Sequence, residues 1–423
     1  MKDMRGVKTS RVYQERRDTV AGHLHGMLHE KKKDIMDEKK NTVDDEDKYT
    51  VVRKDAVDEK KEDMIVGCPE DTVDDGNCCI DEEEKEVVDT RLIYNTTRIL
   101  TDHKECFIDS HCHLDFIYDR YHFDYKDMDD LWRQLSSSVP KSFLGCIANF
   151  VRPGAFMNGK GKYMRWIRDA VKHTSVLGTS FGCHPKYTDK ATDAFFVRMR
   201  QILIEDKRSL KIVAIGECGV DTTDRSTFSL DDQLMCMSRH LELAVEFNLP
   251  LIIHCRQGRD DDRDIEKAVL KVLSKYPYHP IHRHCFTRDA RVAQKWMEAL
   301  KNCSFGFTPM CTSPNSRLEE AIRDIPLDRM LLETDAPYFK PLAFNGLYDH
   351  RTSHPGAAIV SAYRIAEIKD LSIDHVIHAT RTSTARLYQL TDRRFSQRMD
   401  WTSPEYSCVT GRYHHHQPEN NRY

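Results

Sequence analysis

The chain has 423 residues, with 64 lysines and arginines, 68 aspartates and glutamates, and a formal net charge of −4. A charge so near zero argues against a protein that binds nucleic acid through bulk positive charge. No apolar run reaches the roughly 18 residues of a membrane span, and the first ten residues, MKDMRGVKTS, lack the apolar stretch of a secretory signal. We therefore expect an intracellular protein, nuclear or cytoplasmic, that makes no membrane contact and keeps its 14 cysteines as free thiols or metal ligands.

The first hundred residues differ in composition from the rest of the chain. They contain 19 basic and 26 acidic side chains, a net charge of −7 (19 − 26), which leaves +3 for residues 101–423. Acidic runs such as DEEEKE at 81–86 occur there among few aromatic residues. Such a segment buries too little apolar surface to offset its chain entropy. We expect residues 1–104 to form a disordered extension with unidentified protein partners, and residues 391–423 to form a polar tail.

Residues 105–390 have the texture of a folded domain, in which short apolar runs alternate with segments that can be helical. The eight runs are Cys106–Ser110, Phe143–Phe150, Ser175–Gly182, Lys211–Gly216, Leu249–Ile253, Pro280–Phe286, Cys303–Phe307 and Arg329–Glu333. The clearest helix is Asp231–Phe247, which has one apolar face and ends at Asn248. Strand and helix alternating eight times predict an α/β fold, a (β/α)8 TIM barrel.

Polar side chains follow most of these runs at the point where each strand is expected to end. The carboxyl ends of barrel strands meet at one face, where catalytic groups gather. Six candidate metal ligands converge there: His111, His113, Glu217, His254, His284 and Asp335. Residues i and i+2 of a strand point to the same side, so His111 and His113 can face one ion. The pair His282 and His284 has the same spacing, and we prefer His284 as the ligand and assign His282 a supporting role.

Cysteines occur next to these candidate ligands along the chain. Cys112, Cys218, Cys255 and Cys285 each follow one of them, and Cys183 precedes His184. A neighbour of an inward-facing residue points outward beneath the helices, where a small thiol packs well. We therefore expect five buried packing cysteines rather than nucleophiles.

Four imidazoles and two carboxylates are more donors than one ion usually takes from protein. They suit two divalent metal ions, Mg, Mn or Zn, with Glu217 bridging through its two oxygens. Such a pair can activate a water and hold phosphate oxygens during in-line attack. A Gly-rich loop after the second strand adds Arg152, Lys160 and Lys162, which either contact substrate phosphates or lie on a solvated loop.

The motifs IDSHCHLD, FGCHP, AIGECGVD, LIIHCR, HCFT and LLETDAPY, in this order, closely resemble those of the TatD-type deoxyribonucleases of the metal-dependent hydrolase superfamily. The resemblance covers about residues 106–390. It implies a metal-dependent nuclease that acts on DNA, with RNA as an alternative, commonly with added Mg or Mn. The family's metal ligands would fall on the six residues named above. His184 matches the histidine of the family's Gly-x-His-Pro motif, which implies a phosphate contact or proton donor, and Arg256 follows His254 as it does in the family, which implies substrate binding.

One motif departs from the common family pattern. His354-Pro355-Gly356 stands where many members carry Arg-Asn-x-Pro, and this looks more like the eukaryotic branch called TatD-domain-containing protein 2, which also has a long charged N-terminal extension. As a mechanism we expect Glu217, and Asp335 as a ligand or proton acceptor, to help activate a water, and His184 or water to protonate the leaving oxygen. Two other functions stay open: an amidohydrolase or deaminase of small molecules on a related barrel, and a scaffold without catalysis.

Overall fold

The computed structural model of the chain describes residues 99–100, 103–120, 127–159, 161–223, 228–258, 263–344 and 352–390. The expected extension, apart from its last few residues, lies outside these ranges, as do the expected tail 391–423 and Lys160. Among the described residues, no helix is both long and apolar enough to cross a membrane.

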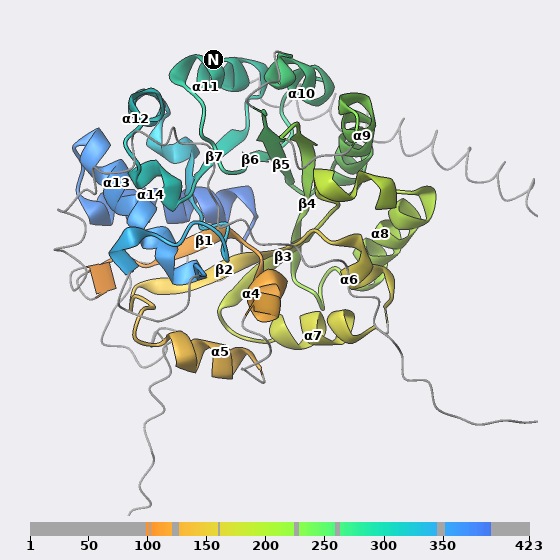
Figure 1. Cartoon of the computed structure of the whole chain (residues 1–423), viewed down its shortest axis with the longest axis horizontal. Helices are drawn as coiled ribbons and strands as arrows, with labels where there is room; N and C mark the ends of the chain where they lie inside the picture. The colour runs from red at the N-terminus through yellow and green to blue at the C-terminus, as the bar shows by residue number, and fades with distance from the viewer. Residues whose placement is uncertain are drawn as a thin grey trace, which may run out of the picture. The chain divides into compact units, whose positions relative to one another are not determined.

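Eight parallel strands form one sheet, and their spatial order is their order in the chain (Figure 1). The strands are β1 (Phe107–Cys112), β2 (Phe143–Phe150), β3 (Val176–Phe181), β4 (Ile212–Asp221), β5 (Leu251–Arg256), β6 (Ile281–Arg283), β7 (Cys303–Phe307) and β8 (Met330–Leu332). The chain just after β8 returns to β1, because the Asp335 N–H donates to the His111 carbonyl at 3.0 Å. The sheet is thus a nearly closed barrel, and the predicted (β/α)8 fold is confirmed.

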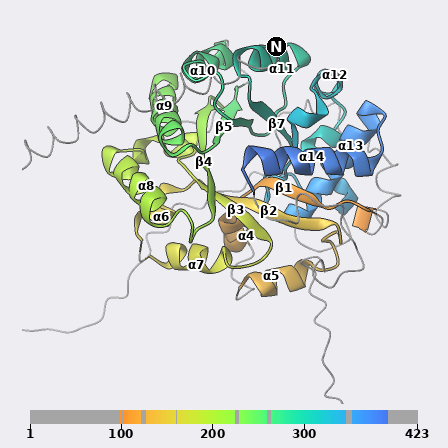
Figure 2. The ribbon, with the colours of Figure 1, turned by 180° about the vertical axis from the view of Figure 1, so that it is seen from behind.

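Helices surround the strands when the barrel is seen from either side (Figures 1 and 2). They are α4 (Leu114–Arg120), α5 (Met128–Leu135), α6 (Pro153–Met157), α7 (Lys162–Ala170), α8 (Asp193–Glu205), α9 (Leu230–Phe247), α10 (Ile265–Leu273), α11 (Ala290–Ala299), α12 (Ser316–Asp324), α13 (Ile359–Lys369) and α14 (Ile373–Leu387). Helix α9 begins one residue before the predicted Asp231, because the Ser229 side chain caps it by accepting the Asp232 N–H. It ends at Asn248 in the left-handed conformation.

The five cysteines beside the predicted ligands are free and buried. Cys112, Cys183, Cys218 and Cys255 belong to the main hydrophobic core. Cys285 differs, because its backbone has a φ of 46° and its Sγ lies 3.9 Å from the Thr308 hydroxyl. The packing role predicted for these cysteines therefore describes the first four better than Cys285.

Strand β4 runs five residues beyond the predicted end at Gly216, which positions two acidic residues on the same strand. Its outer half pairs with β5, with Gly219 opposite His254. Gly219 has a φ of 146°, and a Cβ atom there would lie 1.9 Å from the His254 carbonyl oxygen. This close approach, which only glycine permits, brings the ends of β4 and β5 together at the barrel mouth.

Candidate metal centre

The six predicted metal ligands lie together at the carboxyl ends of the strands, and all six are buried. His111 stands in β1 and His113 directly after it, Glu217 in β4, His254 in β5, His284 just after β6, and Asp335 after β8. Donor atoms of these residues form several groups in which all atoms lie within 4.8 Å of one another. Glu217 belongs to two of these groups, one with His111 and His113 and one with His254 and His284.

In the first group, both histidines present Nε2 to the same carboxylate oxygen. Nε2 of His111 lies 3.4 Å from Glu217 Oε2, and Nε2 of His113 lies 3.6 Å from it. The two Nε2 atoms are 3.3 Å apart. The Nδ1–H of His113 donates to the Asn149 carbonyl at 3.0 Å, so its Nε2 carries the free lone pair in the neutral ring.

The second group uses the other oxygen of Glu217. Nδ1 of His254 lies 2.6 Å from Glu217 Oε1, and Nε2 of His284 lies 3.7 Å from the same oxygen. Asp335 Oδ1 lies 3.1 Å from Nε2 of His113 and 3.7 Å from Nε2 of His284. Each Glu217 oxygen therefore faces its own pair of imidazoles.

The spacing of the donors in the first group fits a divalent metal ion, whereas the 2.6 Å between Nδ1 of His254 and Glu217 Oε1 is a hydrogen-bond distance. Ligands bonded at about 2.0–2.2 Å around one ion lie about 3.0–3.5 Å from each other, close to the 3.3–3.6 Å found in the first group. Glu217 Oε2 is buried and forms no hydrogen bond within the described part of the chain. A buried carboxylate oxygen without a hydrogen bond needs another positive partner, and a cation would supply it.

Burial and neighbouring charges shift the pKa values of these donors in different directions: the carboxylates around His284 raise its pKa to about 9, so a metal ion would have to displace its proton. Burial, helped by the nearby His284, lowers the pKa of His111 to about 4, so His111 is neutral at pH 7. Burial by itself raises the pKa of Glu217, but His284, His111 and His254 together hold it below its usual range. An ionised carboxylate beside a neutral imidazole is the donor set that divalent transition metals take.

His184 lies beside this cluster but presents a proton rather than a lone pair. It caps the short helix η2 (Pro185–Lys190), where its Nδ1 accepts the Lys186 N–H at 3.1 Å. Its Nε2 therefore carries the hydrogen of the neutral ring, and it lies 3.8 Å from Glu217 Oε1. This orientation favours the predicted role as a donor to substrate over a role as a ligand.

The residues predicted to contact substrate differ in where they lie and in whether they already have a partner. Arg256 ends β5, next to His254, and is half-buried there. Lys162 is exposed at the start of α7, whereas Lys160 lies outside the described residues. The Arg152 guanidinium is already engaged, since it lies 3.0 Å from Asp115 Oδ2 and 2.6 Å from Asp119 Oδ2. Arg152 thus pairs with two carboxylates, and its contact with phosphates stays a prediction.

Two acidic residues near the centre were not singled out from the sequence. Asp221 lies 3.1 Å from Nε2 of His254, and Glu333 lies 2.9 Å from Nε2 of His282 and 3.1 Å from Nδ1 of His284. Nε2 of His284, not of His282, points toward Glu217 and Asp335, in accord with the preference for His284. Both carboxylates were predictable from the alternation of side chains along a strand, in which residues separated by an even number point to the same face. Asp221 follows Glu217 by four residues, and Glu333 precedes Asp335 by two.

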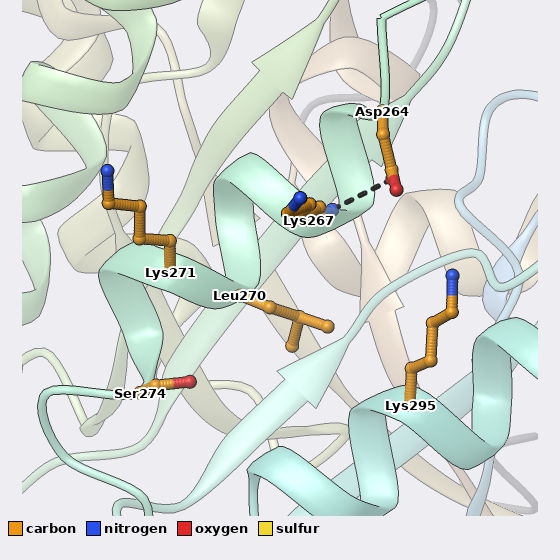
Figure 3. Close-up of a pocket in the computed structure, with 6 residues that line it drawn as sticks. All are labelled: Asp264, Lys267, Leu270, Lys271, Ser274 and Lys295. Carbon is orange, nitrogen blue, oxygen red and sulfur yellow. Dashed lines mark hydrogen bonds between the residues drawn. The ribbon is translucent and has the colours of Figure 1, made fainter.

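A hollow of about 360 Å³ lies away from this centre, between α10 and α11 (Figure 3). Its lining residues are Asp264, Lys267, Leu270, Lys271, Ser274 and Lys295. None of the predicted site residues lines this hollow. The groups of candidate metal ligands lie at the strand ends instead.

A family model described as TatD related DNase matches residues 108–389. The chain belongs to this family. The family resemblance drawn from the six motifs is thus confirmed, and the chain is a metal-dependent hydrolase of the TatD type.

Individual relatives of the TatD family agree with this assignment. The human 3'-5' RNA nuclease TATDN2 is 35% identical over 291 residues, which make up 68% of this chain but only 36% of that protein. The metal-dependent hydrolase YcfH of Escherichia coli is 27% identical over 289 residues, 67% of this chain and 96% of its own length. The crystal structure of the TatD homologue YjjV of E. coli has the same fold, with a TM-score of 0.52 at 23% identity, covering 67% of this chain and 98% of that one.

Proposed function

We propose that the chain is a nuclease that hydrolyses phosphodiester bonds with two divalent metal ions, Mg, Mn or Zn, bound at the strand ends. The observation that carries the proposal is Glu217, whose two oxygens face two separate pairs of imidazoles. Bound there, the ions would lower the pKa of an attacking water and neutralise phosphate oxygens. Family membership supports the reaction class.

Individual side chains at the site would accept a proton, donate to the phosphate and orient the substrate. Glu217 and Asp335 hold negative charge on both sides of the centre, and Asp335 accepts the proton of the attacking water where it does not serve as a ligand. His184 points Nε2–H into the site, where the neutral ring donates a hydrogen bond to a phosphate oxygen or to the leaving oxygen, which takes its proton from water. Arg256 at the mouth, with the predicted Lys160 and Lys162, orients the phosphate backbone.

The direct test is a cleavage assay on end-labelled single-stranded and duplex DNA and RNA, with Mg²⁺, Mn²⁺ or EDTA. We expect products that depend on added metal and disappear with EDTA. The absence of a metal-dependent product on every one of these substrates contradicts the proposal.

Replacement of Glu217 or Asp335 by alanine tests the assignment of the centre. We expect each change to reduce kcat/KM at least a hundredfold, because a lost bridging ligand removes several kcal/mol of transition-state stabilisation. Glu320→Ala, which removes an exposed carboxylate of α12, is the matched control and should leave kcat/KM unchanged. Activity of Glu217→Ala or Asp335→Ala within tenfold of the unmodified protein rules the assignment out.

The choice between DNA and RNA gives two candidate substrates. The family description names DNA as the substrate class, and the motifs favoured it too. The human relative is named an RNA nuclease, and this supports RNA as the second candidate. Comparing kcat/KM on DNA and RNA oligonucleotides of identical sequence decides between them.

A further inference from the structure

A second layer of buried polar groups lies beneath the candidate metal centre, on the barrel side of His284. Its central residue is Glu333, which follows β8 and has no solvent exposure. One carboxylate oxygen lies 3.1 Å from Nδ1 of His284, and the other lies 2.9 Å from Nε2 of His282. Glu333 therefore stands between the two histidines that share the i, i+2 spacing around the end of β6.

Neighbouring groups fix the position of this carboxylate. The backbone N–H of Cys285 donates to Oε1 at 2.5 Å, the same oxygen that faces His284. On the other side Gly306 leaves no spare room, since a Cβ there would lie 2.1 Å from Oε2 of Glu333. Oε1 of Glu333 therefore accepts the Cys285 N–H and lies near Nδ1 of His284, while Oε2 lies near Nε2 of His282.

The other histidine of the layer, His282, contacts a residue that follows one of the outer helices. Nδ1 of His282 lies 2.6 Å from the hydroxyl of Tyr388, the residue that follows α14. The same hydroxyl lies 3.3 Å from the Ser110 carbonyl oxygen of β1. His282 is thus held in contact with Tyr388 on one side and with Glu333 on the other.

We propose that Glu333 is a positioning residue for metal binding: it holds His284 with Nδ1–H toward itself and the Nε2 lone pair toward Glu217 and Asp335. This proposal rests on the proposed metal centre. Carboxylates that hold the far nitrogen of a ligating imidazole fix its tautomer and raise its basicity, and their loss typically weakens metal affinity about 10–100-fold.

The test is a calorimetric titration of the metal-free full-length chain with Mn²⁺, which measures the Kd of each Mn²⁺ binding step. Glu333→Gln keeps the shape of the side chain but removes its negative charge and replaces one acceptor oxygen by an NH2 donor. We expect the Mn²⁺ binding step that involves His284 to weaken at least tenfold, and cleavage to recover when Mn²⁺ is raised above the new Kd. Recovery by added metal separates a positioning role from general damage to the fold.

A matched control is Glu266→Gln. Glu266 is another buried glutamate, whose oxygens accept from Arg283 Nη2 at 3.3 Å and from Trp296 Nε1 at 2.7 Å. It should leave the Kd for Mn²⁺ within twofold of the unmodified protein. A second perturbation, Gly306→Ala, pushes on the Glu333 carboxylate without changing its charge and should weaken Mn²⁺ binding in the same step.

The outcomes separate the two proposals. If the unmodified chain binds none of Mn²⁺, Mg²⁺ and Zn²⁺, the metal centre and the proposed function are both wrong. If the unmodified chain binds Mn²⁺ and Glu333→Gln binds it equally well, only the positioning role is wrong. Equal weakening by Glu266→Gln and Glu333→Gln also overturns that role, because it assigns the effect to lost stability.

Discussion

Charged side chains next to the barrel mouth are compensated by specific partners, and Asp115 is the clearest case outside the metal centre. Its carboxylate is fully buried, and burial raises its pKa even with Arg152 beside it. Arg152 is a quarter exposed and packs over the rings of Phe116 and Tyr163. We therefore expect Arg152 to stabilise the fold by neutralising Asp115.

Replacing Arg152 by methionine keeps the side chain's length and leaves Asp115 without its cation. Breaking a buried pair costs about 3–5 kcal/mol, and the partial exposure of Arg152 reduces the expected loss to about 2–3 kcal/mol in the free energy of unfolding. Urea unfolding at pH 7 measures it. The control Arg133→Met removes a 70% exposed partner of Asp130 and should cost under about 0.5 kcal/mol. Equal losses in the two variants contradict the role assigned to Arg152.

His279, which lies just before β6, gives a prediction of pH dependence away from the metal centre. Burial lowers the pKa of His279 to about 4, against 6.5 for an ordinary histidine. The folded state thus prefers the neutral ring, so this contribution to stability is present above pH 6.5 and is lost as the pH falls toward 4.

For His279 we expect the unmodified chain to lose about 2 kcal/mol more unfolding free energy than His279→Gln between pH 7.5 and pH 5. Urea unfolding of both proteins at the two pH values measures this difference. A pH dependence that is identical in the two proteins shows that the buried imidazole does not contribute.

At the scale of elements, the pairing of β4 with β5 controls where the donors of the second group lie. Gly219 carries this contact, because its missing side chain lets β4 approach the His254 carbonyl. We expect Gly219→Ala to reduce the free energy of unfolding by about 1–3 kcal/mol or more, through overpacking and an unfavourable positive φ. We also expect a loss of cleavage of at least tenfold, since His254 must move.

Gly154→Ala is the control for Gly219→Ala, because no atom lies within 4 Å of a Cβ at that position. Its stability and activity should match those of the unmodified chain. Wild-type activity in Gly219→Ala means that the approach of β4 to β5 does not set the position of His254.

The sequence predicted the strands and their order better than their ends. Apolar runs give the eight strands directly, but β6 was expected over seven residues and has three, because the chain leaves the ladder at His284 to form the site. β4 was expected to end at Gly216, and its continuation depends on pairing with β5, a contact between distant parts of the chain that no local pattern encodes.

That the six candidate ligands lie together was predictable, because the strand ends of a barrel meet. The carboxylates behind them could have been found by applying the period of two along each strand in both directions from the ligand. Asp109 precedes His111 by two residues and accepts its backbone N–H, as Glu333 precedes Asp335 by two, and both carboxylates are buried. The positions of Arg152 and His184 could not be read from the sequence. They depend on which carboxylate or backbone N–H lies nearby in the fold.

At the scale of the whole molecule, charge is divided between two parts of the chain. Residues 1–98 carry 19 basic and 26 acidic side chains, so the rest of the chain has a net charge of +3 (−4 + 7). Net charge was therefore a poor guide to the substrate, because bound metal ions, and not surface lysines, would supply the strongest positive field at the site. The acidic segment would oppose an incoming polyanion through long-range repulsion.

A variant that starts at residue 99 tests this repulsion. We expect it to keep metal-dependent cleavage and to lower KM for a single-stranded oligonucleotide about threefold or more in 0.1 M salt, where charges act over about 10 Å. In 1 M salt the screening length falls to about 3 Å, and the two KM values should converge. A KM ratio that does not change with salt means that the segment acts through a specific contact instead of its charge. Loss of cleavage in the shortened chain means that the barrel needs those residues to form its site.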